Sequence, residues 1–269
     1  MSTPKPLHKL VIITDLNKCF GCNACQLNCK SWHTSSIFGP LTDLNPWGAE
    51  PFSLYLMRVI RIEQGEFPNV RTIPIPISCF HCEDAPCVKV CPTGAIYKRR
   101  VDGVVVIDYE ICQGFRYCIN ACPYGNIDYD PIEGVSKKCV LCVDRLYDEN
   151  LPEYERIPAC VRGCPAGARI FGDLSDPNSE VSRIVSEYGG FVLGEQYGTK
   201  PEEEYLPIRG PSKGPFSNEA ELPLEERFAE RTGAIDNAPE KVLQDAQQLG
   251  LTAEDLRTYK RNEKNVLPL

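Results

Sequence analysis

The amino-acid sequence predicts an α+β fold, and three observations support this prediction. Short runs of alternating apolar and polar residues, typical of half-buried strands, recur along the first two thirds of the chain. Cysteines lie between these runs in a repeat of four groups, and no cysteine follows Cys164. The cysteine-free part contains two segments that we interpret as short helices. We therefore expect a core over residues 1–174 and a C-terminal tail over residues 175–269.

Four β-like runs follow one another along the core. The two in the middle belong to an insert of residues 38–77, which begins with a loop rich in Pro, Gly and Asn and makes this region β-rich. Pro74 and Pro76 would confine the second strand of the insert to a sheet edge or to its own end, because proline cannot donate a ladder hydrogen bond. The four runs are residues 10–13, 54–62, 70–77 and 103–108.

The tail is predicted to be extended and partly helical. Helices are expected over residues 225–231 and 239–260, and Thr252 and Asp255 have the spacing of a capping box. We expect such a tail to bury little by itself and to become ordered against a partner subunit. A partly disordered C-terminus is the alternative.

The fifteen cysteines require a chemical explanation, and disulfides, zinc sites and iron–sulfur clusters are available. Disulfides suit short secreted chains with an even number of cysteines, whereas this number is odd and residues 1–9 lack the layout of an export signal. Zinc would explain paired Cys-x2-Cys units, but not the trailing Cys-x3-Cys-Pro elements or the fourfold repetition. We therefore favour iron–sulfur clusters.

The first cysteine group has the spacing of bacterial ferredoxins. Three of its cysteines can surround one four-iron cubane, while the fourth begins a helix that points away and binds a second cluster. Groups then act in pairs, so we expect two ferredoxin-like dicluster modules. Proline follows the last cysteine of three groups and helps to turn the chain away. The groups are Cys19, Cys22, Cys25 and Cys29; Cys79, Cys82, Cys87 and Cys91; Cys112, Cys118 and Cys122; and Cys139, Cys142, Cys160 and Cys164.

The third group is incomplete, because Phe115 stands at the position of its second ligand. Phenylalanine cannot bind iron, so the simplest expectation is one [3Fe–4S] cluster here beside three [4Fe–4S] clusters elsewhere. Completion of a cubane by Gln113, by Tyr117 or by solvent is the alternative. His81 lies between two cysteines of a complete group, so we interpret it as a neighbour of the ligands and not as a ligand.

Charge, sequence motifs and hydropathy argue against several classes of function. The net charge is −8; residues 1–174 hold 18 basic and 19 acidic residues, and residues 175–269 hold 11 and 18. An acidic chain without a basic patch argues against nucleic acid as a partner. No nucleophile motif or phosphate-binding loop is present, so we expect a non-catalytic redox protein. No apolar stretch approaches the roughly 18 residues that span a bilayer, so we expect a soluble protein whose link to a membrane would come through a partner.

Four cysteine groups in this order, with a long insert after the first, resemble the iron–sulfur subunit of the molybdopterin oxidoreductases of the dimethyl sulfoxide reductase family. The resemblance covers residues 9–174. It implies that the first group pairs with the fourth and the second with the third. Some members of that family carry a non-cysteine residue at the position of Phe115 and hold a three-iron cluster there. The implied ligand sets are Cys19, Cys22, Cys25 and Cys164; Cys29, Cys139, Cys142 and Cys160; Cys79, Cys82, Cys87 and Cys122; and, for the incomplete site, Cys91, Cys112 and Cys118.

Six further stretches look like the iron–sulfur subunit of membrane-bound, cytoplasm-facing sulfite dehydrogenases. That resemblance implies a molybdopterin catalytic subunit and a membrane anchor or haem subunit as partners, and a cytoplasmic, peripherally membrane-associated location. Phe115 departs from the pattern, since a cysteine is expected there. A related reductase of the dimethyl sulfoxide, tetrathionate, polysulfide or arsenate type, or a freestanding multi-cluster ferredoxin, is the alternative. The stretches are residues 41–51, 139–145, 158–168, 171–179, 198–201 and 205–207.

Overall fold

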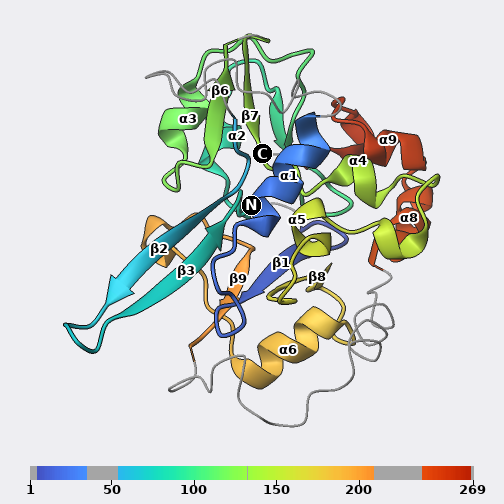
Figure 1. The fold of residues 1–269 in the computed structure, drawn as a ribbon. Coiled ribbons are helices and arrows are strands. Elements are labelled where there is room, and N and C mark those ends of the chain that lie inside the picture. Colours follow the sequence, from blue (N-terminus) through green and yellow to red (C-terminus); the bar gives the residue numbers. More distant parts are fainter. Residues whose placement is uncertain (1–4, 35–53, 132, 209–237, 268–269) are drawn as a thin grey trace.

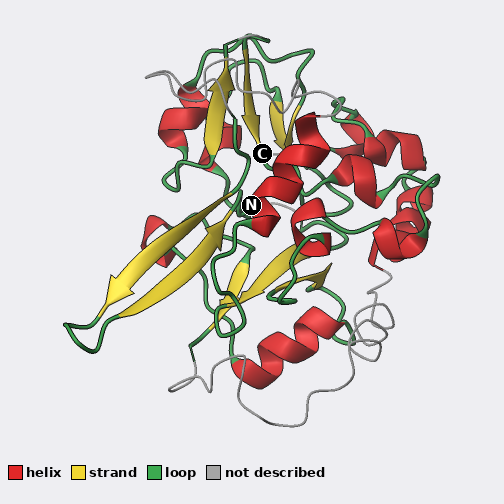
Figure 2. Ribbon diagram, viewed as in Figure 1, coloured by secondary structure: helices red, strands yellow, loops and turns green. Residues whose placement is uncertain are grey.

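The computed structural model describes residues 5–34, 54–131, 133–208 and 238–267. Within these ranges it combines short helices with small, separate sheets (Figures 1 and 2). The predicted α+β class is confirmed. None of the helices in these ranges is long and apolar enough to cross a bilayer.

The largest described sheet brings together the two ends of the predicted core. Strand β1 (Leu10–Asp15) lies between β8 (Arg169–Asp173), which is antiparallel to it, and β9 (Glu204–Leu206), which is parallel. All six residues of β1 are buried, as expected of a central strand. Because the end of β1 pairs with the start of β8, the loop after β1 and the loop before β8 meet. These loops carry the first and fourth cysteine groups.

Two antiparallel hairpins connect the remaining groups. Strands β4 (Ile96–Lys98) and β5 (Val105–Ile107) lie between the second and third groups, and β6 (Ile127–Asp130) and β7 (Val135–Lys138) lie between the third and fourth. Each hairpin pairs the start of its first strand with the end of its second. Consecutive cysteine groups are therefore held side by side.

A Cys-Pro-x-Gly turn occurs three times in the described chain. In each, the glycine N–H donates to the cysteine carbonyl at 3.2 Å, from Gly94 to Cys91, from Gly125 to Cys122 and from Gly167 to Cys164. Proline at the second position of such a turn presets φ, which confirms the turning role predicted for it. A strand begins two residues after each glycine.

The insert contributes a long hairpin of β2 (Arg58–Gln64) and β3 (Arg71–Ile77), which projects from the body of the protein in Figure 1. Its first strand begins later than predicted, at Arg58 instead of residue 54. Pro74 and Pro76 lie in β3 opposite Arg61 and Val59, and among the described residues this sheet consists of β2 and β3. The prediction that these prolines confine the strand to a sheet edge or to its own end is confirmed, since β3 is an edge strand.

The helices of the core are short, and most carry cysteines. A cysteine lies within α1, α2, α3 and α5, and Cys142 precedes α4 as its N-cap residue. The core helices are α1 (Ala24–Thr34), α2 (Pro86–Lys89), α3 (Tyr117–Ala121), α4 (Val143–Leu146) and α5 (Ala159–Arg162). Single 3-10 turns cover Glu153–Glu155, Glu195–Tyr197 and Glu263–Asn265.

The helices of the tail differ from their prediction in two respects. Helix α6 (Glu180–Tyr188), which begins at the N-cap Ser179, was not predicted. The single helix expected over residues 239–260 is instead two, α8 (Ala238–Gln248) and α9 (Ala253–Arg257), because Gly250 adopts a φ of +66° between them. The capping box at the start of α9 is confirmed. The helix expected at residues 225–231 lies outside the described residues.

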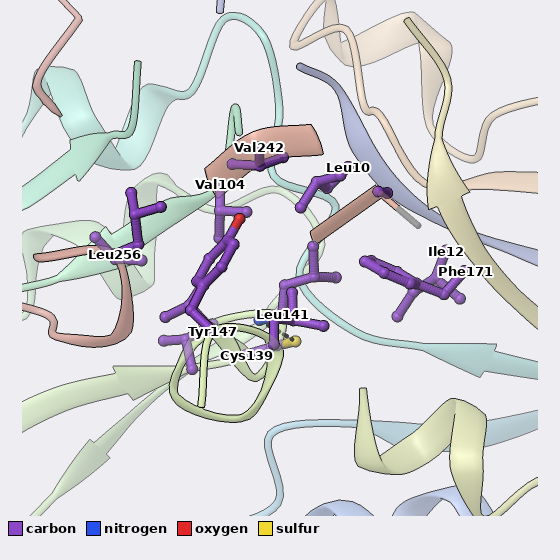
Figure 3. Close-up of a cluster of buried hydrophobic side chains, with 14 of the residues drawn as sticks. Leu10, Ile12, Val104, Cys139, Leu141, Tyr147, Phe171, Val242 and Leu256 are labelled. Atoms are coloured by element: carbon purple, nitrogen blue, oxygen red, sulfur yellow. Dashed lines mark hydrogen bonds between the residues drawn. The ribbon is translucent and has the colours of Figure 1, made fainter. Parts of the chain in front are cut away.

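Helices α8 and α9 pack against the core of their own chain. Val242 and Leu256 are fully buried beside Val104 and Tyr147, in a cluster that also contains Leu10 of β1 (Figure 3). Apolar residues spaced four apart share one face of α8, and that face covers the core. The expectation that the tail buries little by itself is therefore wrong for residues 238–267.

Candidate iron–sulfur cluster sites

Cysteines from paired groups line three cavities in the described chain. Each cavity combines cysteines of one group with a single cysteine from another. Their volumes, including open space at the mouth, are similar at about 350, 320 and 290 Å³ respectively. The sets are Cys79, Cys82, Cys87 and Cys122; Cys19, Cys22, Cys25 and Cys164; and Cys91, Cys112 and Cys118.

The remaining cysteines form a fourth set with little solvent contact. Cys29, Cys139, Cys142 and Cys160 are all buried. Burial, followed by the nearby thiols of Cys139 and Cys160, raises the pKa of Cys29 well above its usual value. The same thiols and Cys29 contribute to the raised pKa of Cys142, after burial and Asp144. These four side chains come from two groups that are far apart in the sequence. In the structure they lie close enough for the thiols to influence one another's pKa.

The four cysteine loops share one backbone feature. The residue before the second ligand position has positive φ in every group: +74° at Gly21, +46° at His81, +68° at Gly114 and +55° at Leu141. Such values are uncommon for residues other than glycine and mark a constrained loop at His81 and Leu141. The repeated conformation turns each loop around its cavity. It is kept in the third group although the next residue there is Phe115.

The third cavity is lined by three thiols and by Phe115. The Phe115 side chain is 51% exposed, and Gln113 and Tyr117 also line this cavity. A Cβ added at Gly114 would lie 2.3 Å from the carbonyl oxygen of Gly134, so the loop cannot accept a larger residue there without moving. Cys118 Sγ lies 3.4 Å from Ser136 Oγ.

The donor chemistry of these sites fits iron–sulfur clusters. In the described part of the chain, no three His, Cys, Asp or Glu side chains are placed to hold one metal ion. The thiols instead surround cavities, and soft thiolates are the usual ligands of iron–sulfur clusters. Burial raises the pKa of Cys25 to about 11 and those of Cys82, Cys87 and Cys139 to about 12. Cluster binding at these positions must therefore displace protons from the thiols.

Buried cations surround the sites, and sequence reasoning missed them. Lys98 Nζ donates to the carbonyls of His81 at 2.8 Å and Cys82 at 3.3 Å, and Lys138 Nζ donates to the carbonyl of Cys139 at 2.9 Å. Arg169, whose side chain is also buried, lines the cavity of Cys19, Cys22, Cys25 and Cys164. A lysine or arginine in a strand is ordinarily interpreted as facing solvent, and no local pattern marked these as buried.

The histidines also have partners that the sequence did not reveal. His81 is buried, and its Nδ1 accepts a hydrogen bond from the Val105 amide at 3.1 Å. His33 is buried with Nε2 3.6 Å from Cys142 Sγ. His8 lies far from the cysteines, with Nδ1 2.6 Å from Asp173 and Nε2 2.9 Å from Asp245 of α8.

Comparisons with known proteins agree with the cysteine chemistry. A family model described as a 4Fe-4S dicluster domain matches residues 70–174. A subunit of the sulfite dehydrogenase of Allochromatium vinosum is 51% identical over 201 residues, which cover 75% of this chain and 84% of that protein. The putative iron–sulfur subunit of a dimethyl sulfoxide reductase from Halobacterium salinarum is 36% identical over 72% of this chain and 78% of its own. A subunit of the tetrathionate reductase of Salmonella typhimurium is 34% identical over 75% of this chain and 73% of its own length.

The resemblance drawn from the cysteine groups is confirmed by these relatives. The region that the family model matches contains the second, third and fourth cysteine groups. The chain therefore belongs to the family of iron–sulfur subunits of molybdopterin oxidoreductases.

Proposed function

We propose that this chain is the electron-transfer subunit of a molybdopterin oxidoreductase complex and relays electrons between a molybdenum subunit and a membrane quinone or haem subunit. The observation that carries the proposal is the mixing of cysteine groups around each cavity, since ligand exchange between paired groups is the hallmark of dicluster ferredoxins. When bound, the clusters supply one-electron oxidation and reduction. The chain itself supplies thiolate ligands, burial and fixed charges.

We assign three [4Fe–4S] clusters to the complete sets and one [3Fe–4S] cluster to Cys91, Cys112 and Cys118. The first and fourth groups would form one module and the second and third the other. The shared sheet of β1 and β8 supports the first pairing, and the β4–β5 hairpin supports the second. Both modules fall within residues 1–174, which we propose as the cluster-bearing core.

The insert and the tail are proposed to contact partner subunits. Phe67, between β2 and β3, is 93% exposed, and such an apolar side chain on a projecting hairpin suits burial against another protein. Exposed apolar residues also border two cavities, Phe20 beside the set that contains Cys19 and Phe115 beside the set that contains Cys112. Attachment to the cytoplasmic face of a membrane would come through the partner.

We propose sulfite oxidation as the reaction of the complex, because the chain is 51% identical to the sulfite dehydrogenase subunit. A related reductase is the second candidate, since relatives with those names are 34–36% identical. The test is purification of the native protein with its mass, molybdenum content and sulfite-dependent quinone reduction measured. A brown, molybdenum-containing complex much larger than 30.1 kDa is expected. A brown monomer without molybdenum would indicate a freestanding ferredoxin, and activity with another oxyanion would exclude sulfite.

A further inference from the structure

Arg169 is a buried cation that lies beside two cysteine sets. It begins β8, five residues after Cys164, and its side chain is only 1% exposed. It lines the cavity that Cys25 and its partners surround. Burial raises the pKa of Cys25 to about 11 and also raises that of Cys160, and in both cases the Arg169 charge is the next largest influence and opposes the rise. Cys25 and Cys160 belong to different sets.

One guanidinium nitrogen, Nη2, has fixed partners, and the other two do not. Nη2 donates to Glu203 Oε1 at 3.1 Å and to Ser78 Oγ at 3.4 Å, while Ser78 Oγ donates to Glu203 Oε2 at 2.9 Å. Nε and Nη1 are buried without a close acceptor among the described residues. A hydrogen bond from the Arg169 side chain is a further influence that lowers the pKa of Cys160. Buried donors ordinarily find acceptors, so two donor nitrogens of a residue that lines a cavity of thiols indicate an acceptor of the kind that cluster or thiolate sulfur provides.

We propose that Arg169 is a positioning residue that raises the reduction potential of the two clusters bound by the sets containing Cys25 and Cys160, and that Glu203 limits this effect. The inference rests on the proposed function, because it concerns bound clusters. Net charge and hydrogen bonds to sulfur are two of the influences that set cluster potentials. A positive charge favours the reduced, more negative state of a cluster, and its effect is large where water is excluded.

A second buried pair provides a matched control in the same chain. Glu202, the residue before Glu203, accepts from Lys98 Nζ at 3.0 Å. Lys98 contacts the Cys82 carbonyl, so this pair belongs to the set that contains Cys79 and Cys82. Neutralisation of Glu202 should therefore act on a different cluster from neutralisation of Glu203.

The experiment is an EPR-monitored redox titration of the purified complex, with iron content measured on every sample. Arg169→Gln should lower the potentials of the two assigned clusters, and Glu203→Gln should raise them. Each change should alter the reduced-to-oxidised ratio at the wild-type midpoint by about tenfold, equivalent to about 59 mV for a one-electron couple. Arg169→Lys should stay near wild type because it keeps the charge. Glu202→Gln should leave both clusters unshifted.

The opposite signs separate an electrostatic role from a structural one. If both charge-removing variants keep their iron but shift the potentials in the same direction, or not at all, the inference is wrong. If Arg169→Gln loses its clusters, the potentials measured for Glu203→Gln still test the inference. The glutamine is isosteric with glutamate and keeps the hydrogen bond to Arg169. A wild-type protein without clusters would instead overturn the proposed function.

Discussion

The ring of Phe115 stacks on that of Tyr117, with ring centroids 6.1 Å apart and planes 11° from parallel. The pair lies in a loop that shares one backbone feature with the other three cysteine groups, the positive φ of Gly114. Three thiols and this ring line the same cavity. The residue before Phe115 therefore has the same backbone conformation as in the other three cysteine groups, although Phe115 itself has no thiol.

Phe115→Cys should convert the proposed three-iron cluster into a four-iron cluster, because it restores the missing thiolate. Anaerobically prepared wild-type protein should show the EPR signal of an oxidised [3Fe–4S] cluster, and the variant should lack it. Phe115→Leu is the control, since it removes the ring without adding a ligand and should keep the signal. An oxidised, fully loaded wild type without that signal would contradict the assignment.

The iron content should be about fifteen atoms per chain, from three four-iron clusters and one three-iron cluster. Metal analysis of the purified complex, normalised to this subunit, measures it directly. Phe115→Cys should add about one iron. A value near eight, or stoichiometric zinc, is incompatible with four clusters.

Leu256→Ala should destabilise the chain by about 2–5 kcal/mol, because it leaves a cavity in a fully buried contact of α9 with the core. The apparent thermal midpoint of the cluster-loaded chain measures this change. Val70→Ala, at a position 46% exposed in the hairpin, is the control and should change stability little. Equal midpoints for the two variants would show that α9 does not contribute to the core.

The contact of His8 with α8 should weaken at alkaline pH. Burial lowers the pKa of His8, but Asp173 and Asp245 outweigh it, so the pKa is raised overall. A raised pKa adds stability below the unfolded value of about 6.5, and this is lost as pH rises through the folded pKa. Because Asp245 is half exposed, the gain should be about 0.5–1 kcal/mol.

The comparison of wild type with His8→Gln tests this. The wild type should have the higher thermal midpoint at pH 6, and the difference should shrink by pH 9. Asp245→Asn should retain part of the pH dependence, because Asp173 still faces the ring. A difference that does not change with pH would show that His8 contributes by packing alone.

The hairpin around Phe67 should be cleaved rapidly by protease in the isolated chain and slowly in the complex. Exposed loop tips are preferred cleavage sites, and a partner that covers this one would protect it. Cleavage of residues 65–70 can be followed by mass spectrometry. Helices α8 and α9 provide an internal control, since their packing on the core should protect them in both states. Equal cleavage rates at the hairpin in the isolated chain and in the complex would show that the partner contacts another part of the chain.

The amino-acid sequence was sufficient to predict thiolate ligands, the grouping of the cysteines and the gap at Phe115. These are local properties, because a loop that surrounds a cluster needs its thiols at short, fixed spacings. The β1, β3 and β5 strands and the capping box of α9 were also predictable, since alternation and capping depend on neighbouring residues.

The packing of the tail and the identity of the buried charges became visible only in the folded chain. Arg169 meets Glu203, and His8 meets Asp245, across 34 and 237 residues of chain. Such contacts leave no periodic pattern in the sequence, because a strand residue can face solvent or core without changing its neighbours. The burial that makes Arg169 a strong influence on two cysteine sets arises only when β1, β8 and the Glu202–Glu203 segment pack together, since charges act strongly where water is excluded.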